Sequence, residues 1–127
     1  MTEVVLDASA LLAVIHGEPG ADVVVASLPG SVMSAVNLAE VVTKLIDNGA
    51  QPGAALAAAQ AFEIKIAPAS ADVASAAGVL HAKTRGRGVS LGDRFCLVLA
   101  QETGLPVLTA DRAWAGLGLP LDIRLIR

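Results

Sequence analysis

Two acidic residues of this sequence follow short apolar runs. Asp7 comes directly after Val4-Val5-Leu6, and Asp111 comes shortly after the apolar pair at 107–108. Runs of this kind, bounded by polar residues, predict buried strands. In an open parallel sheet, binding sites form beyond the carboxyl ends of the strands. Both acids are therefore predicted at the edge of the sheet where a site would form.

Two further acids lie near the starts of predicted helices. Glu40 is in the first half of a helix that follows a strand at 32–33, and Asp93 is in the first turn of a helix that Ser90 caps. Such helices begin at the same edge of the sheet, so all four carboxylates are predicted in one region. Carboxylates brought close together raise one another's pKa values, and a divalent cation removes that cost. Mg²⁺ or Mn²⁺ suits carboxylate and water ligands, and an ion held in this way serves enzymes that cleave phosphodiesters.

Each acid also has a purely structural interpretation as a helix cap. Asp7 and Asp111 precede predicted helices. Asp93 stands three residues after a serine and Glu40 three residues after Asn37, which is the spacing of a capping box. Taken singly, capping is the commoner role for at least three of them. The four together lie in the most apolar segments of the chain, and this favours a metal site.

Strand-like and helix-like stretches alternate along the chain, as in βαβ units. Strands are predicted at 4–6, 32–33, 64–66, 107–108 and 121–126. Helices are predicted at 9–15, 20–28, 35–48, 52–62, 70–84, 91–103 and 111–117. The pattern predicts an α/β fold: a mostly parallel central sheet of four or five strands with helices on both faces, in a single domain spanning residues 1–127.

Composition limits how the protein can bind a partner. The sequence is 54% hydrophobic but only 2% aromatic, so the core must consist mainly of Ala, Val, Leu and Ile. Charged residues make up 17%, below the roughly 25% of ordinary soluble domains; a partner that covers part of the surface would explain this, and so would the Ala-rich composition alone. The net charge of −3 argues against a protein that binds nucleic acid mainly through its phosphates. Any contact with nucleic acid must therefore be local or helped by a bound cation.

The sequence also bears on location. The N-terminus has no basic segment followed by a long apolar run, and no apolar run reaches the roughly 18 residues of a membrane span. A cytoplasmic protein without a membrane segment is therefore expected. The single cysteine, Cys96, is predicted to be a small buried hydrophobe, and the two histidines match no zinc motif.

Around the four acids the sequence resembles the PIN-domain ribonucleases, and more narrowly the VapC-type toxins of type II toxin–antitoxin (VapBC) pairs. The matching segments are 6-LDASALLAVIHGEPGA-21, 34-SAVNLAEVVTKL-45, 90-SLGDRFCLVLAQETGLPVLTADRAW-114 and 121-LDIRLI-126. They occur in the family's order and cover nearly the whole chain. The resemblance implies a parallel sheet flanked by helices, an acidic pocket that holds Mg²⁺ or Mn²⁺, and hydrolysis of RNA phosphodiester bonds.

The resemblance also implies roles for six side chains. The family's catalytic acids and supporting hydroxyls fall on Asp7, Glu40, Asp93, Asp111, Ser9 and Thr109. Asp7 and Asp93 would be the primary metal ligands. Glu40 and Asp111 would bind a second metal ion or orient the attacking water. Ser9 and Thr109 would donate hydrogen bonds to the carboxylates or hold a water of the metal ion.

Five basic residues are candidates for RNA contact. Arg94 and Arg112 each follow a predicted ligand, and Lys83, Arg85 and Arg87 lie in a basic stretch just before the Asp93 helix. The alternatives are a structural ion pair and a solvated loop.

Two other residues carry alternatives of their own. Lys44 stands four residues after Glu40, where it can pair with that acid or contact RNA. Trp114 is predicted to pack against the sheet rather than to stack on a base.

Partners follow from the resemblance. A VapB-type antitoxin is expected to cover the pocket with its C-terminal segment, with the helices at 20–28 and 35–48 as candidates for the groove. A homodimer and a toxin–antitoxin hetero-oligomer are expected as well.

Three competing functions are a PIN-fold nuclease acting on DNA or structured nucleic acid, a non-catalytic binding module whose acids are caps, and a receiver-type phosphoacceptor. The last is disfavoured because no adjacent acid pair accompanies Asp7. The target RNA depends on surface shape, which the sequence does not specify.

Overall fold

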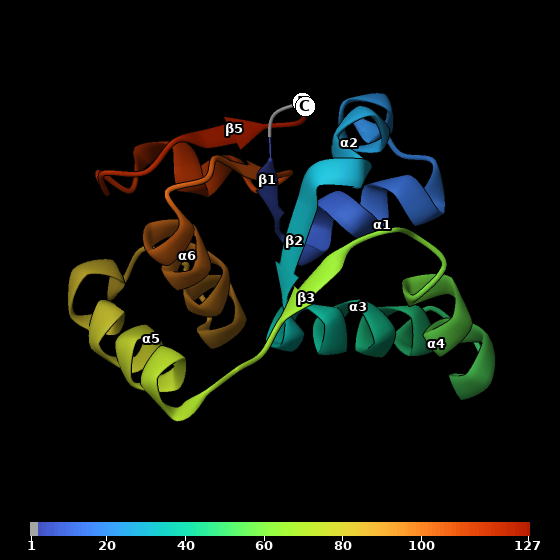
Figure 1. Ribbon diagram of the computed structural model, residues 1–127, viewed down its shortest axis with the longest axis horizontal. Coiled ribbons are helices and arrows are strands. Elements are labelled where there is room, and N and C mark those ends of the chain that lie inside the picture. Colours follow the sequence, from blue (N-terminus) through green and yellow to red (C-terminus); the bar gives the residue numbers. More distant parts are fainter. Residues whose placement is uncertain (1–2) are drawn as a thin grey trace.

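The computed structural model describes residues 3–127, which contain one five-stranded sheet (Figure 1). Its strands are β1 (Val4–Leu6), β2 (Ser31–Ser34), β3 (Lys65–Ala67), β4 (Val107–Thr109) and β5 (Ile123–Leu125). Their order in the sheet is β3-β2-β1-β4-β5, and every neighbouring pair is parallel. The predicted α/β class and parallel sheet are confirmed. The last strand begins later than predicted, because the Leu121 amide turns back to donate to the Leu119 carbonyl, 2.8 Å away.

Helices cover both faces of this sheet, with α1 to α4 on one side and α5 and α6 on the other (Figure 1). The helices are α1 (Ala8–His16), α2 (Ala21–Ser27), α3 (Ala35–Asp47), α4 (Pro52–Ala59), α5 (Ala71–Thr84) and α6 (Leu91–Thr103), with short 3₁₀ turns η1 (Leu28–Gly30) and η2 (Arg112–Gly116). Two predictions were wrong in detail: α4 is three residues shorter than the predicted 52–62 helix, and the predicted 111–117 helix is 3₁₀.

Serine side chains start three of the helices, as predicted from their positions. Ser34 accepts a hydrogen bond from the Val36 amide and Ser70 one from the Val73 amide, each at 3.2 Å. Ser90 forms a reciprocal capping box at the start of α6. These caps fix where α3 and α6 leave the edge of the sheet, and thereby fix the placement of Glu40 and Asp93.

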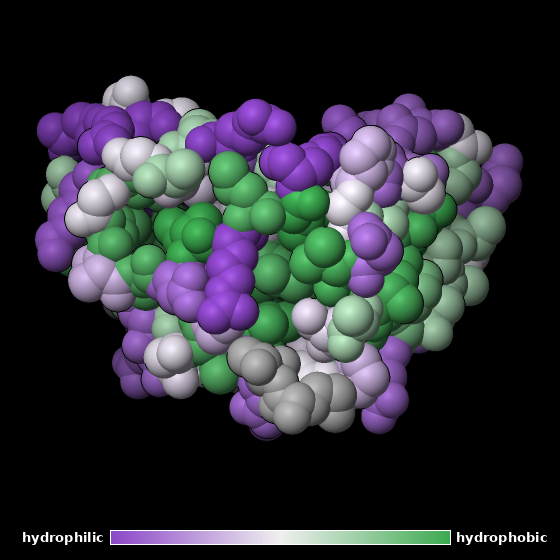
Figure 2. Space-filling model, turned by 90° about the horizontal axis from the view of Figure 1, so that it is seen from above, coloured by the Kyte–Doolittle hydropathy of each residue, from purple (hydrophilic) through white to green (hydrophobic). Residues whose placement is uncertain are grey.

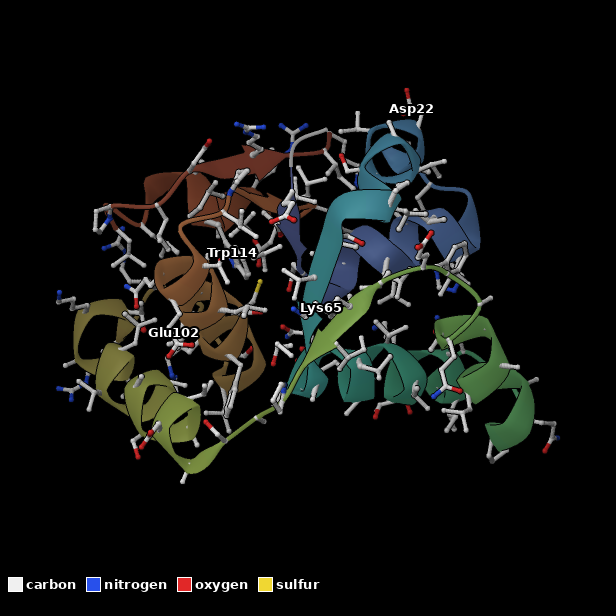
Figure 3. The ribbon with its side chains drawn as sticks, viewed as in Figure 1. Asp22, Lys65, Glu102 and Trp114 are labelled. Atoms are coloured by element: carbon white, nitrogen blue, oxygen red, sulfur yellow. The ribbon has the colours of Figure 1, made fainter. Side chains whose placement is uncertain are left out.

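Two apolar clusters form the core, one on each face of the sheet. Val4 and Leu6 of β1 belong to the cluster under α1 to α4, whereas Val5 faces α6. This alternation is the two-residue period of a strand that is buried on both sides. Trp114 is 1% exposed and lies in the second cluster (Figure 3), so it packs as predicted and its alternative role as a base-stacking surface is wrong. Cys96 is buried, also as predicted.

The strand order reverses beside β1. The chain builds β2 and β3 on one side of β1 and then returns to place β4 and β5 on the other side. A crevice forms beyond the carboxyl ends of the strands at such a switch point. Here it lies between the ends of β1, which is followed by Asp7, and β4, which ends at Thr109 and is followed by Ala110 and Asp111.

No single helix within residues 3–127 is long and apolar enough to cross a membrane, and α1 with the α2–η1 segment passes that test only as a pair bent by 111°.

Candidate active site

A pocket of about 540 Å³ opens at the switch point. Four of the five acids that line it come from four separate parts of the chain: Asp7 after β1, Glu40 on α3, Asp93 on α6 and Asp111 after β4. The remaining lining residues are Ala8, Ser9, Leu12, Val36, Ala39, Thr43, Lys44 and Asp47. The structure therefore brings together all four carboxylates that the sequence singled out.

Asp7 is the most deeply buried of the four acids, with 5% of its surface exposed. Its Oδ2 atom accepts hydrogen bonds from Ser9 Oγ at 2.7 Å and from Thr109 Oγ1 at 3.0 Å. The pKa of Asp7 is raised to about 6, chiefly by burial; the Ser9 and Thr109 hydroxyls lower it, the negative charge of Asp93 raises it, and the Ala8 amide lowers it. Asp7 occupies the N-cap position of α1 but makes no side-chain cap hydrogen bond, so the capping interpretation of this residue was wrong.

Ser9 and Thr109 also tie the two strand ends together. Ser9 Oγ accepts a hydrogen bond from the Ala110 amide at 2.9 Å, and Thr109 Oγ1 accepts one from the Asp111 amide at 3.0 Å. The segment that carries Asp111 is thereby held against the segment that carries Asp7. This contact joins residues about a hundred positions apart in the chain.

The side chain of Glu40 accepts a hydrogen bond from Asn37, a residue whose role was predicted wrongly from the sequence. Asn37 Nδ2 donates to Glu40 Oε1 at 2.7 Å and to the Gly92 carbonyl at 3.0 Å. Asn37 is inside α3, whose N-cap is Ser34, so the capping-box interpretation of Asn37 and Glu40 was wrong. The signal available in the sequence was an amide one helical turn before an acid.

The Asn37 contact is buried, and it leaves one polar atom without a partner. Asn37 is fully buried, and its Oδ1 atom accepts no hydrogen bond within residues 3–127. Gly92 lies so close to Glu40 that a Cβ there would collide with the carboxylate. Partial burial raises the pKa of Glu40, the Asn37 hydrogen bond lowers it, and the charge of Asp93 raises it.

Asp93 and Asp111 are both pocket residues and helix caps. The Ser90 amide donates to Asp93 Oδ2 at 2.9 Å, and the Ala113 amide donates to Asp111 Oδ1 at 3.0 Å. The pKa of Asp93 is raised by burial, lowered by its hydrogen bonds with Ser90, raised by Asp111 and lowered by Arg94. The predicted caps are present at both residues, and they leave the acids facing the pocket.

All four acids share one feature of their hydrogen bonding. Each uses one carboxylate oxygen to accept a hydrogen bond from the protein. The second oxygen of each accepts no hydrogen bond of normal geometry from residues 3–127. The protein thus anchors each acid and leaves one oxygen of it available to another ligand.

These available oxygens bear on whether a divalent cation fits the pocket. Across the described chain, no three His, Cys, Asp or Glu side chains already form a set that could hold a metal ion. Mg²⁺ usually keeps several waters and binds through only one or two carboxylates. An open pocket of anchored carboxylates, each with one available oxygen, therefore fits a hydrated Mg²⁺ or Mn²⁺. The set of three aspartate ligands stays a prediction.

None of the five basic residues predicted to contact RNA lines the pocket. Arg94 Nε donates to the Ala77 carbonyl at 2.9 Å and its Nη1 lies 3.0 Å from His81 Nδ1, so this guanidinium joins α6 to α5. Arg87 donates to the Gly116 carbonyl. Lys83, Arg85 and Arg112 are exposed.

The basic residue that does line the pocket is Lys44. The ion pairs among residues 3–127 do not include it, so of its two alternatives the pairing of Lys44 with Glu40 is absent.

A parallel α/β domain with an acid-lined pocket at its switch point belongs to a class that includes nuclease domains. The family model that matches is the PIN domain, over residues 4–118, and the chain belongs to this family. PIN domains of the VapC type are nucleases, and hydrolase chemistry fits the pocket described above. No curated protein matches the chain at a significant level of similarity.

Solved structures resemble the fold over nearly its whole length. A chain of the DNA-bound VapBC complex of Salmonella typhimurium is 19% identical, with both chains covered in full and a TM-score of 0.77. VapC20 of Mycobacterium tuberculosis, a Sarcin-Ricin loop cleaving toxin, is 21% identical over 92% of this chain and 96% of its own, with a TM-score of 0.78. A toxin–antitoxin complex of Klebsiella pneumoniae is 21% identical over 98% of each chain, with a TM-score of 0.71.

Proposed function

We propose that the protein is a metal-dependent endoribonuclease toxin of the VapC type, which a cognate antitoxin inhibits. The observation that carries the proposal is the convergence of Asp7, Glu40, Asp93 and Asp111 on one pocket, each with one oxygen available. Helix caps alone need no such convergence. PIN-family membership supports hydrolysis of a phosphodiester as the reaction.

Asp7, Asp93 and Asp111 are proposed to hold Mg²⁺ or Mn²⁺, and Glu40 to orient water or hold a second ion. Bound there, such an ion would supply a water nucleophile at neutral pH and would neutralise negative charge on the phosphate. The chain's own contribution is to fix the carboxylates in place. Ser9 and Thr109 hold Oδ2 of Asp7, so Oδ1 remains available to a ligand.

The neighbouring acids are fixed in the same way. Asn37 holds Oε1 of Glu40, and the Ser90 amide holds Oδ2 of Asp93. Fixing ligands in advance reduces the reorganisation needed when substrate binds. The pKa values of Asp7, Glu40 and Asp93 are raised chiefly by burial and to a smaller extent by the charge of a neighbouring acid, and this cost of ionisation supports a site for a divalent cation.

RNA is proposed as the substrate because the structural relative from Mycobacterium tuberculosis cleaves the Sarcin-Ricin loop.

A VapB-type antitoxin is proposed as the partner because several relatives are VapBC complexes. Val23 and Val25 of α2 and Leu125 of β5 are large apolar side chains that remain exposed. Figure 2 looks onto the side where α2 and β5 lie and shows apolar side chains gathered across the middle of it.

We propose that a partner covers this surface in a toxin–antitoxin hetero-oligomer that also contains a toxin homodimer. Location in the cytoplasm and a single domain over residues 1–127 belong to the same proposal.

The test is digestion of total cellular RNA by the purified protein, free of antitoxin. The reactions contain Mg²⁺, Mn²⁺ or EDTA, and parallel reactions contain single-stranded and duplex DNA. Asp7→Asn is compared with Asp72→Asn, the same substitution at an exposed acid outside the pocket. Discrete RNA fragments that require metal, survive Asp72→Asn and disappear in Asp7→Asn are expected. Cleavage of DNA in place of RNA would move the activity to the alternative nuclease class.

A non-catalytic binding module is the second candidate, and the caps formed by Asp93 and Asp111 favour it. Mn²⁺ binding by the purified protein distinguishes the two, because caps alone hold no ion. A folded protein that binds no Mn²⁺ and cuts no nucleic acid would be assigned to the binding module.

A further inference from the structure

The charges around the pocket are strongly unequal. Among the lining residues, five are acids and one, Lys44, is a cation. The fifth acid is Asp47, which lies one turn after Lys44 on α3. A polyanionic substrate must enter against this field, so the position of the single cation influences where its phosphates can bind.

Lys44 is free to take part in such binding. Its side chain is exposed and forms no ion pair with the acids of the described chain, although Glu40 and Asp47 lie on neighbouring turns of the same helix. No hydrogen bond to its ammonium group is present within residues 3–127 either. An ammonium group with three donors and no protein acceptor is suited to a phosphate oxygen.

The spacing between Lys44 and Glu40 along α3 matches the spacing between neighbouring phosphates of an RNA strand. Four residues of α-helix rise about 6 Å, which is comparable with the distance between neighbouring phosphates of an extended single strand. Leu12, Val36 and Ala39 line the same pocket and give it an apolar wall. A ribose or base between two bound phosphates would lie against such a wall.

The other cations near the sheet edge are less well placed. Arg94 and Arg87 already donate to backbone carbonyls, and the other three candidates lie outside the pocket lining: Lys83, Arg85 and Arg112. An RNA strand that crossed the 83–87 segment instead would leave Lys44 without a contact to RNA.

We propose that Lys44 binds the phosphate next to the scissile one, so that the RNA strand crosses the pocket along α3 towards the C-terminal end of that helix. The inference rests on the proposed ribonuclease function. It assigns a residue that positions the substrate outside the acid cluster, and it gives the RNA strand a path across the site along α3.

The test measures KM and kcat for a short single-stranded RNA that spans the cleavage site mapped by the total-RNA digestion. Lys44→Ala is expected to raise KM about fivefold to tenfold, the loss of one partly exposed charge-assisted contact, with kcat nearly unchanged. The slope of log KM against log salt should become shallower by about 0.7, the value for one phosphate contact on a single strand. Lys44→Arg should restore most of the affinity, and Lys65→Ala, at an exposed cation outside the pocket lining, should behave as wild type.

A chemical substitution on the RNA identifies the phosphate. Each phosphate flanking the cleavage site is replaced in turn by a neutral methylphosphonate. One flanking position should raise KM in the wild type and have no further effect in Lys44→Ala, because both changes remove the same contact.

Wild-type KM and salt slope in Lys44→Ala, with normal cleavage by the wild type, would overturn the Lys44 proposal and leave the ribonuclease proposal intact. The same holds if the two changes are additive at every position. Absence of any cleavage by the folded wild type would overturn both proposals together. Lys44→Gln replaces Lys44→Ala if circular dichroism shows that α3 is disturbed.

Discussion

Replacing Asp7 by Asn should stabilise the metal-free protein at neutral pH. The pKa of Asp7 is about 6 in the folded protein against an ordinary value of 3.8, chiefly because the carboxyl group is buried. A difference of one in pKa corresponds to about 1.4 kcal/mol, so ionised Asp7 costs the fold about 3 kcal/mol above pH 7. Asn keeps the shape of the side chain and an oxygen that can accept from Ser9 and Thr109, but it carries no charge.

The gain in stability depends on pH in a defined direction. A folded-state pKa above the unfolded value means that the folded protein binds the proton more tightly, so the wild type gains stability as pH falls from about 7 to about 4. The advantage of Asp7→Asn over the wild type should therefore be about 3 kcal/mol at pH 7.5 and should vanish near pH 4.

Urea unfolding in EDTA at several pH values measures this difference. Asp72→Asn, at an exposed acid in the first turn of α5, is the matched control and should change the free energy of unfolding by no more than about 0.5 kcal/mol. An Asp7→Asn protein less stable than the wild type at pH 7.5, or an advantage that does not shrink as pH falls, would refute the electrostatic account of this site.

Three further predictions concern the neighbours of the acids and the metal ion. In urea unfolding, Gly92→Ala should be less favourable than Gly78→Ala by about 1 kcal/mol, because its Cβ displaces the Glu40 carboxylate from its hydrogen bond with Asn37, whereas Gly78→Ala in the open interior of α5 should stabilise the fold by about 0.5–1 kcal/mol. Equal effects of the two changes would contradict the close approach. Asn37→Ala should lower kcat at least tenfold with little change in KM for RNA, since it releases Glu40 without removing a substrate contact. An unchanged kcat would show that Glu40 needs no support. Millimolar Mn²⁺ should raise the Tm of the wild type in thermal unfolding. It should raise the Tm of Asp7→Asn much less, because that variant lacks one ligand of the ion; equal increases in the two proteins would place the ion elsewhere.

Much of the architecture could be predicted from local patterns in the sequence. The alternation of short β-branched runs with helical stretches predicted the α/β fold and the parallel sheet. Ser34, Ser70 and Ser90 marked the starts of their helices because capping is a local interaction between near neighbours. The errors fall where local signals are weak: the Ala-rich end of α4, and the turn after Asp111.

The grouping of the acids was predicted because it depends on topology. Residues that follow parallel strands, and those in the first turns of the helices after them, lie at one edge of the sheet. The chain-order pattern therefore indicated that Asp7 and Asp111 would be neighbours, although more than a hundred residues separate them.

Only the tertiary structure decided what each of these side chains does at that edge. The sequence allowed Asn37 to be a cap, Lys44 to pair with Glu40 and Arg94 to be free for RNA. Folded, Asn37 joins Glu40 to the Gly92 carbonyl, Lys44 remains unpaired at the pocket, and Arg94 joins α6 to α5. The sequence determined which elements form and at which edge the acids lie, because caps and hydrophobic periods act over a few residues. The hydrogen bonds that join separate segments, Ser9 to Ala110, Asn37 to Gly92 and Arg94 to Ala77, were decided by contacts between residues far apart in the chain, which no local pattern encodes.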